Sequence, residues 1–176
     1  MNIDDDDDDD DGIKEMRKLY PNVTFWKYCT KEWQDLSIAK NAVIGKDVSI
    51  GNCTKIGSGA VIGDNVELGC DVKIGDGAVI EKNTIIRCDT EIGEGAIIGE
   101  YTRMEGCRTV IGEYSEIGKH CEIRETVQMR RRAKIGNYSK IAQNAKIGEG
   151  VELGDESNVT IGSVLNKYVK KEEQNK

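Results

Sequence analysis

The chain has 176 residues with six cysteines and one proline, which is enough for a single domain with a sizeable apolar core. Its formal net charge of −7 comes from one segment, because Asp4 to Asp11 are eight consecutive aspartates and the charge without them is +1. The overall acidity therefore gives no information about a ligand, and the absence of a long apolar run excludes a membrane-spanning helix.

The first segment, residues 1–12, is predicted to be a disordered acidic tail, since like charges along the aspartate run repel one another and stay solvated. Calcium binding or recognition of a partner by this run are the alternatives. The start MNIDDDDDDD is the opposite of the basic and then apolar leader of a secreted protein. A cytoplasmic location is therefore expected, and the cysteines are interpreted as thiols.

Residues 13–37 are predicted to form an N-terminal cap. Ile13 to Tyr20 is expected to form a short helix that ends at Pro21, and the following VTFWKYC is expected to form a strand. Three aromatic residues of this segment are expected to cover the open end of the repeat that follows: Phe25, Trp26 and Trp33.

Residues 38–165 carry a six-residue repeat. An aliphatic anchor returns at every sixth position, with one slip of one residue between Met104 and Ile111. The fourth residue after each anchor is small or β-branched, and the third is often Asn or Gly, which tolerate a left-handed corner. Short strands joined by tight corners keep such a period, whereas a helix of 3.6 residues per turn and a plain hairpin sheet do not. The anchors are Ile38, Ile44, Ile50, Ile56, Ile62, Leu68, Ile74, Ile80, Ile86, Ile92, Ile98, Met104, Ile111, Ile117, Ile123, Met129, Ile135, Ile141, Ile147, Leu153 and Val159.

In this repeat the chain resembles the hexapeptide-repeat superfamily, which is rich in acyltransferases. The resemblance implies an all-β, left-handed parallel β-helix of six to seven coils, each of 18 residues. Residues 166–176 are polar and are predicted to form a C-terminal tail. The hand of the coil is taken from the family, because it departs from the usual right-handed crossover rule.

Side chains 18 residues apart, or 19 across the slip, are expected to lie in columns along such a coil. The column just before every third anchor begins with four apolar residues that point outward, Val43, Val61, Val79 and Ile97. So orderly an apolar ladder marks an interface. Relatives of this fold form parallel homotrimers through such a face, so a homotrimer is predicted, and a monomer with an apolar stripe is the alternative.

Other columns alternate in charge, for example Lys82, Glu100 and Lys119. Alternating charges at strand spacing stabilise the stack and pin its register. They also leave no uncompensated basic stripe, so nucleic-acid binding is not expected.

His120 is the only histidine. Three-histidine zinc sites of the carbonic anhydrases that share this fold are therefore excluded. Hexapeptide acyltransferases commonly use one histidine as general base, a task that suits an imidazole near neutral pH. The column of His120 contains Tyr101 and Tyr138, which a ligand could contact, and these two are predicted as ligand-binding residues. The alternative is a purely structural role for His120, because its position is a left-handed corner that histidine tolerates.

Cysteines and arginines are the other candidates. Cys70 and Cys88 are predicted to share a corner column, with Cys53 and Cys107 one position along, too spread out for one tetrahedral ion, so no metal site is predicted. Three arginines are predicted ligand-binding residues: Arg108 and Arg130, which have no obvious partner and suit an anion, and Arg132, which is expected to stack on Tyr114.

Three functions stay open. The preferred one is a trimeric acyltransferase that uses acetyl-CoA or another acyl-CoA, with His120 as base and a hydroxyl or amine of a small sugar-like molecule as acceptor. Family enzymes commonly carry a long loop and a proline-containing C-terminal segment, whereas here the repeat is interrupted by one residue and the only proline is Pro21. The alternatives are therefore a non-catalytic trimer that binds a small anionic or nucleotide ligand between subunits, and a structural or scaffold subunit.

Overall fold

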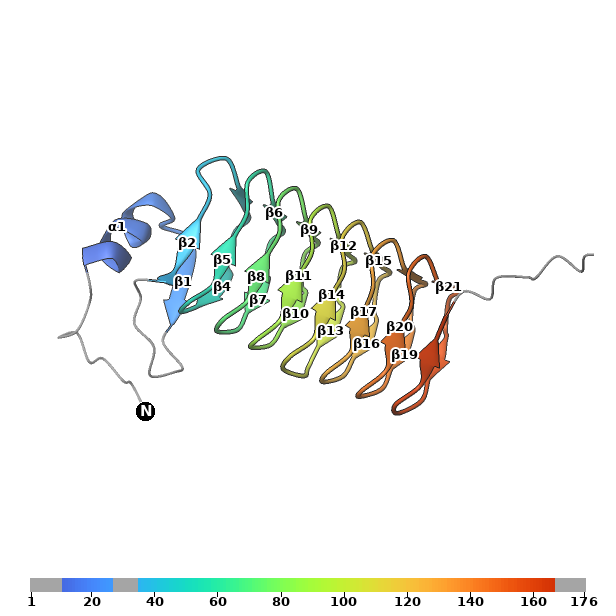
Figure 1. Cartoon of the computed structure of the whole chain (residues 1–176). Coiled ribbons are helices and arrows are strands. Elements are labelled where there is room, and N and C mark those ends of the chain that lie inside the picture. The colour runs from blue at the N-terminus through green and yellow to red at the C-terminus, as the bar shows by residue number, and fades with distance from the viewer. Residues whose placement is uncertain (1–10, 27–34, 167–176) are drawn as a thin grey trace, which may run out of the picture.

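The computed structural model describes residues 11–26 and 35–166, and it consists of one short helix followed by a long stack of coils (Figure 1). Helix α1 spans Asp11–Leu19, so it begins two residues earlier than predicted and ends before Pro21 as expected. The predicted strand after Pro21 is β1, Val23–Trp26. The predictions for most of the aspartate run, for Trp33 and for most of the C-terminal tail fall on residues outside the described part of the chain.

Each coil contributes one short strand to each of three parallel sheets, which are named here by their first strands. The β1 sheet contains β1, β4 Val48–Gly51, β7 Glu67–Leu68, β10 Ile85–Ile86, β13 Arg103–Met104, β16 Glu122–Ile123, β19 Lys140–Ile141 and β22 Asn158–Val159. The β2 sheet contains β2 Ser37–Ile38, β5 Lys55–Ile56, β8 Lys73–Ile74, β11 Glu91–Ile92, β14 Val110–Ile111, β17 Gln128–Met129, β20 Lys146–Ile147 and β23 Val164–Leu165. The β3 sheet contains β3 Val43–Ile44, β6 Val61–Ile62, β9 Val79–Ile80, β12 Ile97–Ile98, β15 Glu116–Ile117, β18 Lys134–Ile135 and β21 Glu152–Leu153. The hexapeptide-repeat parallel β-helix is confirmed, with about seven turns of roughly 18 residues.

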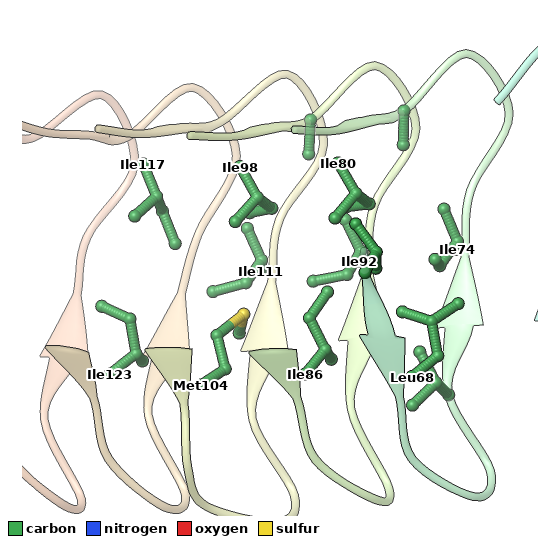
Figure 2. Packing of buried hydrophobic residues seen from close by; sticks show 14 of the residues in the cluster. Leu68, Ile74, Ile80, Ile86, Ile92, Ile98, Met104, Ile111, Ile117 and Ile123 are labelled. Carbon is green, nitrogen blue, oxygen red and sulfur yellow. The ribbon is translucent and has the colours of Figure 1, made fainter. Parts of the chain in front are cut away.

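The anchors form the core because each pairs in register with the anchor of the next coil. Ile98, for example, lies between Ile80 and Ile117 in the β3 sheet. Figure 2 shows successive anchors from the three sheets pointing into the same interior. Methionine replaces an aliphatic anchor at Met104 and Met129 and is equally buried, since its flexible chain fills the same space. Burial of these side chains, at roughly 25 cal/mol per Å² of apolar surface, is the main force holding the coils together.

The corners depend on two backbone features. The third residue after most anchors has a positive φ, as in Asn65 at 57° and Gly59 at 66°, which turns the chain into the next face. The first residue after an anchor is commonly glycine because neighbouring coils approach closely there. A Cβ added to Gly118, for instance, would lie 2.7 Å from the backbone nitrogen of Asn137.

Small polar side chains in the interior are satisfied by the coil above. Hydroxyl groups at the fourth position donate to carbonyl oxygens, as in Thr54 to Gly69 at 2.9 Å and Thr102 to Gly118 at 2.8 Å. No buried side-chain nitrogen or oxygen lacks a hydrogen-bond partner within residues 11–26 and 35–166. These bonds let threonine and serine take the small position without the cost of an unpaired buried polar group.

The N-terminal segment covers the first coil. Ile13 and Phe25 are buried against the core, and β1 pairs in parallel with β4, which adds a strand to the β1 sheet. The covering is incomplete, because the anchors Ile38 and Ile44 are only half-buried. Phe25 thus serves as the predicted plug, whereas Trp26 points more toward solvent.

The predicted charge ladders are present as ion pairs between adjacent coils. Glu100 lies 3.5 Å from the Lys82 amine and 2.9 Å from that of Lys119. Arg131 and Glu149 are 2.8 Å apart. The lysines and Arg131 are solvent-exposed and Glu100 is half-buried, so water screens these pairs and they act mainly on the register of the coils. A search of the described ranges finds no helix that is long and apolar enough to cross a membrane.

Candidate functional site

The predicted column around His120 is a stack of three aromatic rings, called here the corner stack: Tyr101, His120 and Tyr138. Its ring centroids are 4.9 Å apart between Tyr101 and His120, and 5.0 Å apart between His120 and Tyr138. The planes deviate by only 4° and 3°. The spacing is that of neighbouring strands, because each ring comes from the same corner of a successive coil.

The corner stack occupies the edge between the β3 and β1 sheets, directly after β12, β15 and β18 (Figure 1). All three residues have positive φ, between 55° and 59°. A side chain in this region costs about 1–2 kcal/mol relative to glycine. Stacking, at roughly 0.5–1.5 kcal/mol per pair, offsets part of that cost. The rings therefore support one another at an exposed corner, where Tyr101 is 46% and Tyr138 59% exposed.

His120 is exposed, and its backbone N–H donates to the carbonyl of Glu100 at 3.0 Å. Its imidazole has no hydrogen-bond partner within the described ranges, so both ring nitrogens are available to a ligand. Among residues 11–26 and 35–166 no carboxylate bonds to the ring, in contrast to the arrangement that commonly fixes the tautomer of a catalytic histidine. The two tyrosine faces orient it instead.

The neighbouring charges are already engaged with one another. A hydrogen bond from Lys119 lowers the pKa of the Glu100 carboxyl, with the positive charges of Lys119 and Lys82 acting in the same direction. The same hydrogen bond raises the pKa of Lys119. Lys119 therefore stays protonated at neutral pH.

A shallow hollow of about 650 Å³ lies beside the corner stack on the β3 sheet. Its floor is a run of glycines on successive coils, and one rim is formed by Lys119 and Asn137. The three rings of the corner stack do not line it. The glycines are Gly99, Gly118, Gly136 and Gly154.

The predicted ligand-binding arginines lie elsewhere. Arg130 and Arg132 follow β17, at the edge between the β2 and β3 sheets, and Arg108 follows β13, at the third edge. The structure thus brings Tyr101, His120 and Tyr138 together and places the arginines apart from them. Their roles in binding stay predictions.

Within the described residues, Arg132 makes no stacking contact with the Tyr114 ring, although one was expected from their shared column. The Tyr114 hydroxyl instead donates to a carboxylate oxygen of Glu94, and this hydrogen bond raises the pKa of the tyrosine. The ring covers Gly95, whose added Cβ would lie 2.6 Å from the Tyr114 Cδ1 atom. Because residue 95 is glycine, the Tyr114 ring has room to lie over the preceding coil.

The cysteine column differs from the prediction in one position. Cys107 lies in the same column as Cys70 and Cys88, because the inserted residue precedes it and Arg108 takes the left-handed corner with φ 60°. The backbone bonds agree, since Thr126 donates to the Cys107 carbonyl as Asp89 does to that of Cys70. No group of three metal-ligating side chains close enough to hold an ion occurs in the part of the chain that the structure describes.

The predicted outward ridge on the β3 sheet is present. Val43 is 57% exposed, Val61 38% and Ile97 40%, while Val79 is half-buried. The same column continues into charge, with Lys134 2.8 Å from Glu116. The ridge is an apolar surface next to the hollow and the corner stack.

Side chains that accept hydrogen bonds from backbone N–H groups of the preceding coil were not predicted from the sequence. Asp64 and Asn137 accept hydrogen bonds from the backbone N–H of Lys46 at 2.8 Å and of Lys119 at 2.9 Å, each on the preceding coil. The available signal was an Asp or Asn two residues after an anchor. The Asn137 bond fixes the backbone immediately before His120.

Comparison with known proteins gives a family and a set of similar folds. The family model described as the GMPPB C-terminal domain matches residues 44–172. No curated protein sequence matches the chain.

Among solved structures, the chain resembles AntD, an N-acyltransferase from Bacillus cereus solved with dTDP and coenzyme A. The identity is 16% and the TM-score 0.56, over 85% of this chain and 84% of that one. A GDP-perosamine N-acetyltransferase mutant from Caulobacter crescentus, solved with CoA and GDP-perosamine, is 18% identical with a TM-score of 0.45, over 85% of this chain. The UDP-N-acetylglucosamine acyltransferase of Francisella novicida is 20% identical with a TM-score of 0.45, over 73% of this chain. The chain spans only 60% and 58% of the length of these last two.

Proposed function

This chain belongs to the GMPPB C-terminal domain family, and we propose that it is an acyltransferase subunit that uses an acyl-CoA, with His120 as general base. The corner stack is the observation that supports this proposal. Its single imidazole is exposed and stacked between two tyrosine rings, and in the described residues the ring nitrogens have no hydrogen-bond partner. The similarity to AntD, an N-acyltransferase solved with coenzyme A, makes this chemistry the first to test.

In this proposal His120 accepts the proton of an acceptor hydroxyl or amine as that group attacks, and acyl-CoA supplies the activated thioester carbonyl. A new ester or amide bond forms, the carbon–sulfur bond breaks, and the proton ends on the thiol that leaves. The hydroxyl groups of Tyr101 and Tyr138 flank the imidazole at one coil's distance on either side. That row of polar edges suits a small acceptor with several hydroxyl groups, such as a sugar.

The test is the substitution His120→Asn. Asparagine occupies the same column at Asn65 and Asn83 with positive φ, so it is compatible with this corner and cannot act as a base. We expect release of free CoA from acetyl-CoA, with amino sugars and sugar nucleotides as acceptors, to fall at least 100-fold.

The matched control is Glu156→Asn, two coils after His120 in the same column, where φ is 58°. It should turn over like the unsubstituted protein. Undiminished turnover in His120→Asn would remove the catalytic role of the imidazole.

We also propose that the ridge joins copies of this chain as a homotrimer. Val61→Glu should lower the mass measured by light scattering from that of a trimer to that of a monomer, because it would bury a charge in the interface. Val110→Glu is the matched control: Val110 is 39% exposed and also precedes an anchor, but it lies on the β2 sheet. A monomeric unsubstituted protein, or equal effects of both substitutions, would contradict the proposal.

A second candidate is a non-catalytic subunit that binds a small anionic or nucleotide ligand. The observation in its favour is the missing carboxylate partner of His120, together with a hollow that the imidazole does not line. Its signature is thermal stabilisation by a sugar nucleotide with no release of CoA from acetyl-CoA.

A further inference from the structure

The edge between the β2 and β3 sheets carries a groove that the corner stack does not share. Residues on or directly after β14, β17, β20 and β23 line it along four successive coils, and it has a volume of about 730 Å³. Figure 1 shows β14, β17 and β20 on neighbouring coils. The groove therefore lies along a different edge of the prism from His120, which follows β15.

Arg130 rises from the floor of this groove. The equivalent positions one coil before and one coil after are Gly112 and Gly148. Glycine is required at Gly112, because an added Cβ would lie 2.4 Å from the backbone nitrogen of Arg131. The guanidinium of Arg130 thus has no side chain beside it in its own column, which leaves room for a ligand on either side.

Two cations of the groove have no carboxylate partner. In the described residues, neither Arg130 nor Lys146 has an oxygen of Asp or Glu within 4.0 Å, and both side chains are exposed. Arg131, which also lines the groove, is paired with Glu149 at 2.8 Å. The pairing neutralises one charge of each sign and leaves Arg130 and Lys146 as the cations of the lining without an ion-pair partner in the described residues.

Neutral hydrogen-bonding groups complete the lining. Gln128 lies one coil before Lys146 in the same column, and Asn166 lies one coil after Gly148. Their side-chain amides can donate to anionic oxygens. One unpaired carboxylate, that of Glu113, also lines the groove, so a weakly charged anion gains little there.

We propose that Arg130 and Lys146 form a binding site for a phosphate anion, with a diphosphate favoured over a single phosphate. Two cations from adjacent coils can each bind one phosphoryl group, and a guanidinium binds phosphate oxygens in a bidentate manner. Arg130, Lys146 and Glu113 together leave a net positive charge, so the more highly charged diphosphate is attracted more strongly than a single phosphate. The ligand is free diphosphate or the diphosphate of a nucleotide, and the site is independent of the reaction proposed for His120.

The test is calorimetric titration of the full chain with inorganic pyrophosphate at low salt, in the absence of acyl-CoA. We expect Arg130→Ala and Lys146→Ala each to weaken binding at least tenfold. Arg87→Ala is the matched control, since Arg87 also directly follows an anchor, is exposed and lies outside the groove. It should change the Kd less than twofold. Orthophosphate should bind more weakly than pyrophosphate to the unsubstituted protein.

Parallel titrations with UDP and ADP separate the two sources of the ligand. Tighter binding than pyrophosphate identifies a nucleotide, and equal or weaker binding identifies the free anion. The site is disproved if pyrophosphate does not bind, or if Arg87→Ala weakens binding as much as Arg130→Ala. His120→Asn should leave the titration unchanged, so loss of this site and loss of acyl transfer are distinguishable.

Discussion

The corner stack makes a prediction that separates its structural role from its chemistry. Replacing His120 with Asn removes two parallel ring contacts, at centroid distances of 4.9 and 5.0 Å, while keeping a residue that accepts positive φ. Each contact is worth about 0.5–1.5 kcal/mol. The loss is therefore about 1–3 kcal/mol, reduced by the better fit of Asn to a left-handed corner.

A double-mutant cycle isolates the contact itself. His120→Asn and Tyr138→Asn, alone and together, should give a coupling energy of about 0.5–1.5 kcal/mol. The control cycle pairs Tyr101→Asn with Tyr138→Asn. These rings are two coils apart and separated by His120, so their coupling should stay below about 0.5 kcal/mol.

Urea unfolding followed by far-UV circular dichroism measures all these variants, and the dependence of free energy on urea should be the same for each. Equal coupling in the two cycles would show that the stacked geometry adds nothing to stability. Coupling as predicted, together with loss of CoA release in His120→Asn, would mean that one side chain serves both the corner and the chemistry.

Two further predictions concern the core and the thiols. Ile98→Ala should lower the free energy of unfolding by about 2–5 kcal/mol, because Ile98 is fully buried between two coils, and Ile44→Ala on the half-buried first coil should cost less than half as much; equal losses in urea unfolding would contradict this. Desolvation, helped by the neighbouring Cys88 and Asp89, raises the pKa of the exposed Cys107 thiol, so less of it is thiolate at neutral pH than in free cysteine. Its alkylation by iodoacetamide at pH 7.5, followed by peptide mass spectrometry, should be slower than that of N-acetylcysteine and should still rise at a pH where the free thiol has levelled off; faster labelling at pH 7.5 would refute the shift.

The sequence predicted that the three rings of the corner stack share a column. Tyr101 and His120 are 19 residues apart across the slip, and His120 and Tyr138 are 18 apart, so their column follows from counting. Cys107 shows where counting fails. The anchors Met104 and Ile111 are seven residues apart instead of six. The place of the extra residue between them decides which column Cys107 joins. Only the backbone, with Arg108 in the left-handed corner, located the insertion before Cys107.

The sequence by itself determined the coil, its core and the outward ridge, because a six-residue period leaves one choice of which side chains face inward. The tertiary structure decided which charged groups pair across coils and which remain free. Spacing places Arg131 between Glu113 and Glu149 but does not choose between them, because the choice depends on the direction of a long side chain, and Arg131 pairs with Glu149. The missing partner of Arg130 followed from its column of glycines, whereas that of Lys146 in the described residues did not. The tertiary structure also placed His120 along one edge of the prism and Arg130 and Lys146 along another, because the successive strands of each coil belong to three different sheets.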